Sequence, residues 1–333
     1  MNIKRFGRFS HDIIIIDGFY GTGKSLIFPI IGSLSGVEKV QHKPIYEQLC
    51  ILNWLNKIDQ KSCEELIAYY ADMHQYNNLI GREVNIKLGD DTSIFNNPNI
   101  LKYIKRIFVK NFQDDNTSKD FALQLFTHNL LSISDPLFNS LGERLKFIEI
   151  VRHPLYIVKH FSIALERLFL ETKSQFETCV DVDGVKVPWF AKDYSKEFLR
   201  ANNVDRAIIC MLNLFSDIEK ISNENQFLIL SFESFVTSPD SNIEKICSFL
   251  GREKPSDINT VLKKQKIPRK NISAGKGHSQ YGWKDQSYKN EIQIYNSNLK
   301  FAQDNCSSQN FEKLLKLIDW YDKKFPSLLS KFT

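Results

Sequence analysis

Short apolar runs alternate with stretches of helical periodicity along the chain. Residues 13–16 are four isoleucines in succession, a pattern typical of a strand buried on both faces of a parallel sheet. Similar runs, the first of them strictly alternating, predict four further strands at 84–88, 121–126, 146–151 and 227–231. Apolar residues at helical spacing predict helices at 26–34, 45–57, 63–75, 97–109, 136–142, 155–171, 194–221, 238–250 and around 311–318.

A glycine-rich segment follows the first predicted strand directly. Its sequence GFYGTGKS satisfies the pattern G-x-x-x-x-G-K-[ST], in the strand-to-helix context that this phosphate-binding motif requires. The glycines let backbone N–H groups face a phosphate at a helix N-terminus, and the lysine adds a positive charge. A glycine-rich turn that binds nothing is the alternative. The motif predicts phosphate-group binding by Gly18, Phe19, Tyr20, Gly21, Thr22, Gly23, Lys24 and Ser25.

The alternation of strands and helices predicts the α/β fold class. We expect a three-layer α/β/α P-loop architecture in which a central, mainly parallel sheet lies between helices. No linker, repeat or low-complexity tract divides the chain, so residues 1–333 are expected to form a single domain. A helical and loop insertion is expected around 166–222, with a loop or hairpin at 172–190.

Polar side chains follow two of the predicted strands directly. Thr127 and His128 come after the strand at 121–126, and Arg152 comes after the strand at 146–151. Parallel sheets bind ligands at the carboxyl ends of their strands, so we expect these residues to meet the phosphate loop at one sheet edge. There His128 can accept a proton, or it can be a strand-end histidine held by hydrogen bonds. Arg152 can bind a phosphate through two N–H groups, or form a structural salt bridge.

Composition and charge narrow the function classes. The formal net charge of +5 is compatible with an anionic ligand but does not indicate a nucleic-acid platform. The six cysteines are far apart and show no C-x-x-C spacing, which favours free thiols over a disulfide framework or a metal site. Near the N-terminus only four apolar residues follow the basic ones, too few for a signal-peptide core. No apolar run approaches the ~18 residues of a membrane helix, so we expect a cytoplasmic protein without a membrane or nucleic-acid partner.

The order of these motifs resembles the sulfotransferases that use 3′-phosphoadenosine-5′-phosphosulfate (PAPS). The resemblance covers about residues 13–283 and rests on segments that match in order and spacing. GFYGTGKS stands at the place of the family's 5′-phosphosulfate loop, and Thr127-His128 resembles the segment that holds its catalytic histidine. The other matching segments are IEIVRHP at 148–154, LSFESF at 230–235, ICSFLG at 246–251, and the basic glycine-rich stretch from Pro268 to Trp283.

The resemblance implies an α/β enzyme that moves a sulfuryl group from PAPS to an acceptor and releases PAP. It implies a hydroxyl or amine acceptor on a small molecule or carbohydrate, with Lys24 and His128 as the catalytic residues. Glu233 is expected to order the site, whereas Trp189 and Phe190 line an acceptor pocket or pack in the core. The implied cofactor-binding residues beyond the loop are Arg152, His160, Ser162, Arg269, Lys270 and Lys276.

The sequence departs from the family pattern at two places. The family usually has Lys or Arg where this chain has Gly21, so Lys24 is the only cation of the loop. The serine that contacts the 3′-phosphate lies eight residues after the arginine in the family. That position is His160 here, and Ser162 follows two residues later. Either side chain can therefore take the role of that serine.

Two other functions fit the phosphate loop. A Mg²⁺-dependent P-loop kinase or ATPase needs an acidic residue at a strand end to help hold the metal. The strands that end at 126 and 151 are followed by Thr-His and Arg, and only Glu233 follows a strand closely. This apparent lack of a metal carboxylate favours sulfuryl transfer, and no metal site is expected. The second alternative is a non-catalytic nucleotide-binding protein. The oligomeric state stays open.

Overall fold

A central sheet of five parallel strands organises the molecule. The computed structural model describes residues 8–108, 121–170, 178–218, 225–272 and 290–331, without the side chains of 167–170. The strands, in spatial order, are β2 (Gln41–His42), β3 (Ala122–Phe126), β1 (Asp12–Asp17), β4 (Leu145–Val151) and β7 (Phe227–Ser231). Residues 13–16 are at most 1% exposed because strand β1 has a neighbour on each side and helices over both faces.

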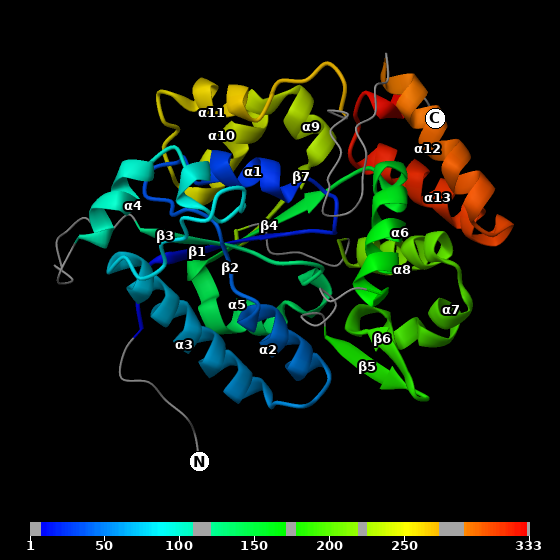
Figure 1. The fold of residues 1–333 in the computed structure, drawn as a ribbon, viewed down its shortest axis with the longest axis horizontal. Coiled ribbons are helices and arrows are strands. Elements are labelled where there is room, and N and C mark those ends of the chain that lie inside the picture. The colour runs from blue at the N-terminus through cyan, green and yellow to red at the C-terminus, as the bar shows by residue number, and fades with distance from the viewer. Residues whose placement is uncertain (1–7, 109–120, 171–177, 219–224, 273–289, 332–333) are drawn as a thin grey trace.

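Helices cover both faces of the sheet (Figure 1), which gives the three layers expected from the sequence. One layer contains α1 (Lys24–Ile31), α9 (Phe232–Thr237), α10 (Pro239–Leu250) and α11 (Ile258–Lys264). The opposite layer contains α2 (Ile45–Trp54), α3 (Gln60–Leu79) and α5 (Asp135–Leu141). The predicted fold class, α/β with a parallel central sheet, is therefore confirmed.

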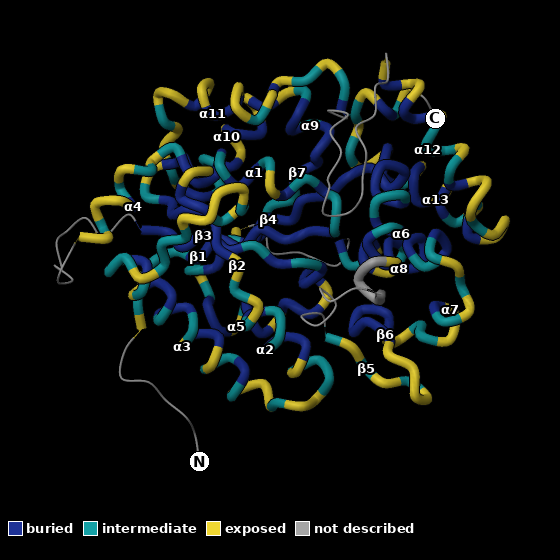
Figure 2. Tube along the Cα trace, viewed as in Figure 1, coloured by how far each residue is buried: buried dark blue, intermediate teal, exposed yellow. Residues whose placement is uncertain are grey.

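A further group of helices packs beside the sheet. It contains α6 (Pro154–Leu170), α7 (Ser195–Arg200), α8 (Asn203–Ile218), α12 (Glu291–Asn305) and α13 (Ser308–Lys324). The antiparallel hairpin of β5 (Cys179–Val182) and β6 (Val185–Pro188) lies beside α7 and α8. Buried apolar side chains of the sheet and of these helices form one continuous cluster, and Figure 2 colours the chain dark blue wherever residues are buried. Within the described residues, no helix is both long and apolar enough to cross a bilayer.

The predicted strand at 84–88 is wrong. These residues form an irregular segment and a turn outside the sheet, and Ile86 and Leu88 are 63% and 77% exposed. The side chain of Asn85 explains the difference, because its Oδ1 accepts a hydrogen bond from the N–H of Lys87 at 2.9 Å. Such a local bond offers the backbone an alternative to a sheet ladder. Apolar alternation alone therefore misidentified an exposed segment.

The predicted helix at 194–221 is interrupted. A 3-10 helix at Trp189–Tyr194 leads into α7, and a separate helix α8 starts at Asn203. The Oδ1 of Asn202 accepts hydrogen bonds from the N–H groups of Val204 and Asp205, at 3.0 and 2.9 Å. An Asn that satisfies the first free N–H groups of a helix favours a new helix start at that point. The short strand β2, α9, α11, α12 and α4 (Ile100–Ile107, predicted as 97–109) complete the described elements.

Candidate functional site

The phosphate loop connects β1 to α1 at the carboxyl edge of the sheet. Gly18, Gly21 and Gly23 have φ values of 143°, 86° and 90°, a backbone region that favours glycine. A Cβ on Gly23 would lie 2.2 Å from a ring carbon of Phe232, the first residue of α9. The loop therefore fits closely against the β7–α9 connection, and Ser25 is exposed at the start of α1.

Lys24 is the cation of the loop, and its side chain is largely buried. Its ammonium group donates to the main-chain oxygens of Gly18 and, at 3.1 Å, of Phe19. Burial lowers the pKa of Lys24, whereas the negative charges of Asp17, Glu149 and Glu47 act in the opposite direction. The ammonium group thus lies inside the loop, among three acidic side chains.

These acidic side chains correct the argument from the sequence that no carboxylate lies at the strand ends beside the phosphate loop. Carboxylates do lie beside the phosphate loop, because Asp17 ends β1 and pairs in register with Glu149 of β4. Asp17 is fully buried, and its oxygens accept from the Thr127 hydroxyl at 2.9 Å and from two main-chain N–H groups at 2.7 and 3.1 Å. Burial raises the pKa of Glu149 well above its ordinary value, and the negative charge of Asp17 acts in the same direction. Asp17 thus serves to hold the β3 terminus against β1.

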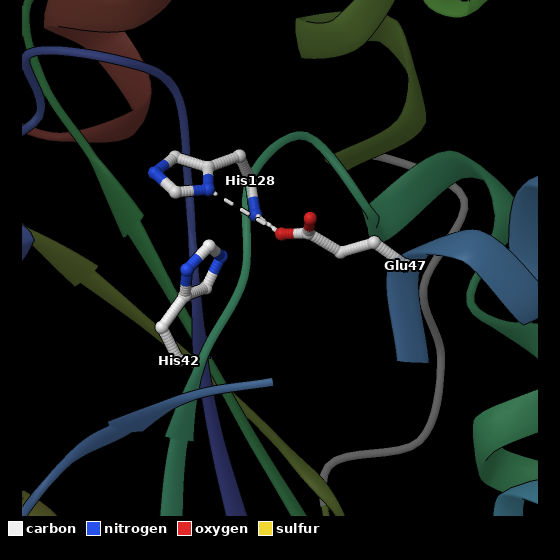
Figure 3. Close-up of side chains that lie close together, drawn as sticks. All are labelled: His42, Glu47 and His128. Carbon is white, nitrogen blue, oxygen red and sulfur yellow. Dashed lines mark hydrogen bonds and ion pairs between the residues drawn. The ribbon is translucent and has the colours of Figure 1, made fainter. Parts of the chain in front are cut away.

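His128 lies against the phosphate loop, next to Glu47 of α2 (Figure 3). Its ring stacks on Tyr20 with centroids 4.6 Å apart, and a carboxylate oxygen of Glu47 lies 3.3 Å from Nδ1. The same oxygen accepts from the main-chain N–H of His128 at 2.7 Å. The contact with Tyr20 brings the strand-end histidine and the loop together, as expected from the topology.

Burial sets the protonation of this pair. Burial and, to a smaller extent, the charge of Lys24 lower the pKa of His128 to about 3, so its imidazole is neutral near pH 7. Burial raises the pKa of Glu47 to about 7, while His42, the N–H of His128 and Lys24 pull it down. His42, Glu47 and His128 also place one ligand atom each within 4.8 Å of one another, so they are the group that could hold a metal ion among the described residues.

Arg152 approaches the loop from the end of β4. Its Nη1 donates to the main-chain oxygen of Gly21 at 2.8 Å, and its guanidinium lies 4.5 Å from the ring centre of Phe232. Burial lowers the pKa of Arg152. The buried Nε has no hydrogen-bond partner among the described residues. This environment does not support the structural salt bridge considered from the sequence, and it places a positive charge beside Gly21.

The other predicted phosphate ligands divide into three groups. His160 and Ser162 lie on α6. Burial and, to a smaller extent, the charge of Arg152 lower the pKa of His160 to about 3. Ser162 Oγ donates a hydrogen bond to the main-chain oxygen of Lys159 at 2.9 Å. Arg269 is also within electrostatic reach of Arg152, which together with burial lowers the pKa of Arg269 to about 10. Lys270 is exposed, and Lys276 lies outside the described residues.

Glu233 and the aromatic pair at 189–190 have structural surroundings. The carboxylate of Glu233 accepts from the N–H of His153 at 3.0 Å and from the hydroxyls of Ser231 and Tyr321 at 3.1 and 2.7 Å. It therefore ties the β4 and β7 ends to α13, which is an ordering role. The side chains of residues 189 and 190 are 4% and 8% exposed and pack in the core.

Glu47 is the residue of this site that sequence reasoning missed. It belongs to the predicted helix at 45–57, but no motif or spacing marks it as a partner of His128. Its position depends on the two-residue strand β2, which pairs with β3 and directs α2 toward the strand end. A strand of that length has no readable pattern of its own.

Comparisons with known proteins give a family match. The profile described as the sulfotransferase domain matches residues 92–274, more than half of the chain, and this range does not include the phosphate loop at 18–25. No curated protein sequence matches the chain.

Several solved structures are similar to the chain. The sulfotransferase domain of the Synechococcus PCC 7002 olefin synthase is 13% identical, with 96% of this chain and 98% of that chain covered and a TM-score of 0.42. The sulfotransferase domain from the curacin biosynthetic pathway is 12% identical over 93% and 98%, with a TM-score of 0.41. A mouse sulfotransferase complexed with PAP is 12% identical over 97% and 88%, with a TM-score of 0.38. From the profile match, the chain belongs to the sulfotransferase domain family.

Proposed function

We propose that the protein transfers a sulfuryl group from PAPS to a hydroxyl or amine of a small-molecule or carbohydrate acceptor. The observation that carries the proposal is the stacking of Tyr20, from the phosphate loop, on His128 at the end of β3. It puts a group able to accept a proton directly beside a loop able to hold a phosphosulfate. The family assignment supports the same chemistry.

The residues of the loop fit a ligand with two anionic groups. The glycine-rich turn and the N-terminus of α1 favour one phosphate. We expect the second anionic group to bind Arg152, whose buried Nε lacks a hydrogen-bond partner among the described residues and whose charge acts on Arg269. The charge of Arg152 contributes to the lowered pKa of Arg269, and an anion beside both guanidinium groups would stabilise their charged forms. His160 and Ser162 of α6 are the further candidates for this second contact.

PAPS, when bound, supplies a sulfuryl group on a phosphate leaving group. The acceptor oxygen or nitrogen forms a new bond to sulfur as the bond from sulfur to the bridging phosphate oxygen breaks, and PAP leaves. Lys24 and the loop N–H groups stabilise the negative charge that develops on the phosphate. Arg152 adds positive charge beside Gly21, the position where the family usually has a cation.

His128 is positioned to take the proton of the acceptor. The Glu47 oxygen next to Nδ1 favours the tautomer with its proton on Nδ1, which leaves the lone pair on Nε2 free to accept. Glu47 stabilises the imidazolium that forms, through the carboxylate oxygen that lies 3.3 Å from Nδ1. A single histidine acting in this way contributes about 10²–10⁴-fold to a rate.

Transfer of radiolabelled sulfate from PAPS tests the proposal. A panel of alcohols, amines and sugars is assayed with and without EDTA, and PAP binding is measured by calorimetry. We expect PAP binding, and transfer that EDTA leaves unchanged. Hydrolysis or transfer that requires ATP and Mg²⁺, without PAP binding, would replace the proposal with a P-loop kinase or ATPase.

A further inference from the structure

A polar cavity lies beside β2, the strand that pairs with β3 just before His128. Its volume is about 310 Å³, and it lies at the open edge of the sheet, where β2 is the outermost strand. The lining residues come from residues 39–43, which include β2, from residues 82–85 and from Thr92: Lys39, Gln41, His42, Lys43, Arg82, Glu83, Val84, Asn85 and Thr92. None of these residues belongs to the phosphate loop.

The cavity has an excess of positive charge. Lys39, Lys43 and Arg82 face one carboxylate, that of Glu83, which pairs with Lys43 at 2.7 Å. Two of the three cations are thus left without a carboxylate in the cavity wall. Arg82 lines the cavity, and its guanidinium also lies 5.9 Å from the ring centre of Tyr76, which is not one of the lining residues.

Among these cations, Lys39 gives the main evidence that the cavity binds an anion. The residue is only 4% exposed, and its amine donates to the main-chain oxygen of Thr92 at 3.0 Å rather than to a carboxylate. A buried ammonium is costly unless a negative charge compensates it. Burial accordingly lowers the pKa of Lys39 to about 8. An anion in the cavity would supply the missing charge.

The cavity reaches the candidate catalytic site through His42. This residue lines the cavity, pairs in register with Phe126, and its ring centroid lies 5.8 Å from that of His128. Neighbouring strands are about 4.8 Å apart. A small molecule held by the lysines can therefore extend along the sheet edge and present a second group to His128.

We propose that this cavity is the acceptor subsite and that the acceptor carries an anionic group, a phosphate or a carboxylate, bound by Lys39, Lys43 and Arg82. The hydroxyl or amine that receives the sulfuryl group lies at the other end of the molecule, next to His42 and His128. This inference rests on the proposed function for the identity of the reaction. The anion site itself rests only on the cavity.

Calorimetry on the PAP-saturated protein tests the anion site, because PAP occupies the phosphate sites of the loop. Inorganic phosphate and acetate are titrated separately, as probes of the two anion sources. We expect saturable binding of at least one probe, weakened at least 10-fold by Lys39→Gln. Arg82→Gln should weaken binding of the probe similarly. Because Arg82 is exposed, this variant tests the anion site even if the buried Lys39→Gln variant misfolds. The matched control Arg200→Gln, at an exposed residue of α7, should bind as the wild type does.

The outcomes separate the two proposals. Absence of binding by both probes, or equal binding by the wild type and Arg82→Gln, overturns the anionic acceptor. Failure of PAP to bind overturns the proposed function, and the effect of Arg82→Gln on the phosphate titration then decides the anion site alone. A transfer assay completes the test. Glycerol 3-phosphate and glycerate should be better acceptors than glycerol in the wild type, and this preference should fall in Arg82→Gln.

Discussion

The imidazole of His128 and the carboxylate of Glu47 set the chemistry of the site at the scale of single residues. Burial drives their pKa values in opposite directions, to about 3 for His128 and about 7 for Glu47. Near neutral pH the histidine is therefore uncharged, and the carboxylate is close to its titration midpoint. Catalysis that depends on this pair should respond both to substitution and to pH.

Replacement of His128 by alanine should separate cofactor binding from transfer. The loop, Lys24 and Arg152 remain in His128→Ala, so PAP affinity should stay within about twofold, whereas transfer should fall by about 10²–10⁴-fold. Calorimetry with PAP and radiolabelled sulfate transfer measure the two quantities. His11→Ala is the matched control, because this histidine precedes β1 at the opposite end of the strand. Unchanged transfer in His128→Ala would remove the histidine as the proton acceptor.

Replacement of Glu47 by glutamine should change the pH dependence of transfer. Ionised Glu47 stabilises the Nδ1–H tautomer of His128, so the wild-type rate should rise with pH through about 7, the pKa of the carboxyl. In Glu47→Gln this rise of the rate near pH 7 should be absent, and transfer should be slower than in the wild type above pH 7, with PAP affinity unchanged. If the rate rises near pH 7 in both the wild type and the variant, a group other than Glu47 causes the rise.

The residues of the site differ in how far sequence could predict them. The loop at 18–25 and the strand-end residues His128 and Arg152 were predictable, because each stands at a fixed offset from an apolar run. Glu47 and Glu149 were not, because their side chains reach the site from within regular elements, where no local pattern distinguishes a functional carboxylate from an ordinary one.

At the scale of elements, the phosphate loop packs tightly against α9, where Gly23 meets the ring of Phe232. Both of the elements joined by the loop were predicted, but α9 was not, because its six residues are too few for a helical period to be recognised. The segment at 84–88 shows the opposite limit. It has a clear strand pattern, yet Asn85 turns the backbone and leaves the apolar side chains at the surface.

The contact between Gly23 and Phe232 predicts the effect of a methyl group in the loop. In Gly23→Ala the new Cβ would meet the aromatic ring at 2.2 Å, so either the loop or α9 must shift. We expect PAP affinity to fall by at least 10-fold and the melting temperature to fall as well. Calorimetry and thermal unfolding measure the two effects.

A glycine of the β5–β6 hairpin provides the control for this variant. Gly184 has φ +80°, close to the +90° of Gly23, but a Cβ there would meet nothing within 4 Å. Gly184→Ala should therefore carry only the backbone strain, about 1–2 kcal/mol, and keep PAP affinity. Equal effects of the two variants on PAP affinity would contradict the role of the close contact.

At the scale of the whole molecule, buried histidines predict sensitivity to acid. Burial is the main cause that lowers the pKa of His74 to about 4 and those of His128 and His160 to about 3. In the unfolded chain these groups titrate near pH 6.5. The unfolded state therefore binds more protons than the folded state between these values, and the stability contributed by the neutral histidines is lost as pH falls through this window. Glu47, with its raised pKa, acts in the opposite direction between about pH 4.5 and 7.

Each buried histidine lowers the free energy of unfolding as pH falls from 6.5 to 4.5, whereas Glu47, Asp17 and Glu149, whose pKa values are raised, act in the opposite direction. Urea unfolding at intervals of half a pH unit measures the slope. His74 is the histidine to replace, because it lies on α3 and is not one of the candidate site residues. Its Nδ1 is 2.9 Å from the Tyr46 hydroxyl. His74→Gln removes one titrating group and should reduce the slope by up to about 1.4 kcal/mol per pH unit. The same slope between pH 6.5 and pH 4.5 in the wild type and in His74→Gln would contradict the contribution of this buried imidazole to the acid sensitivity.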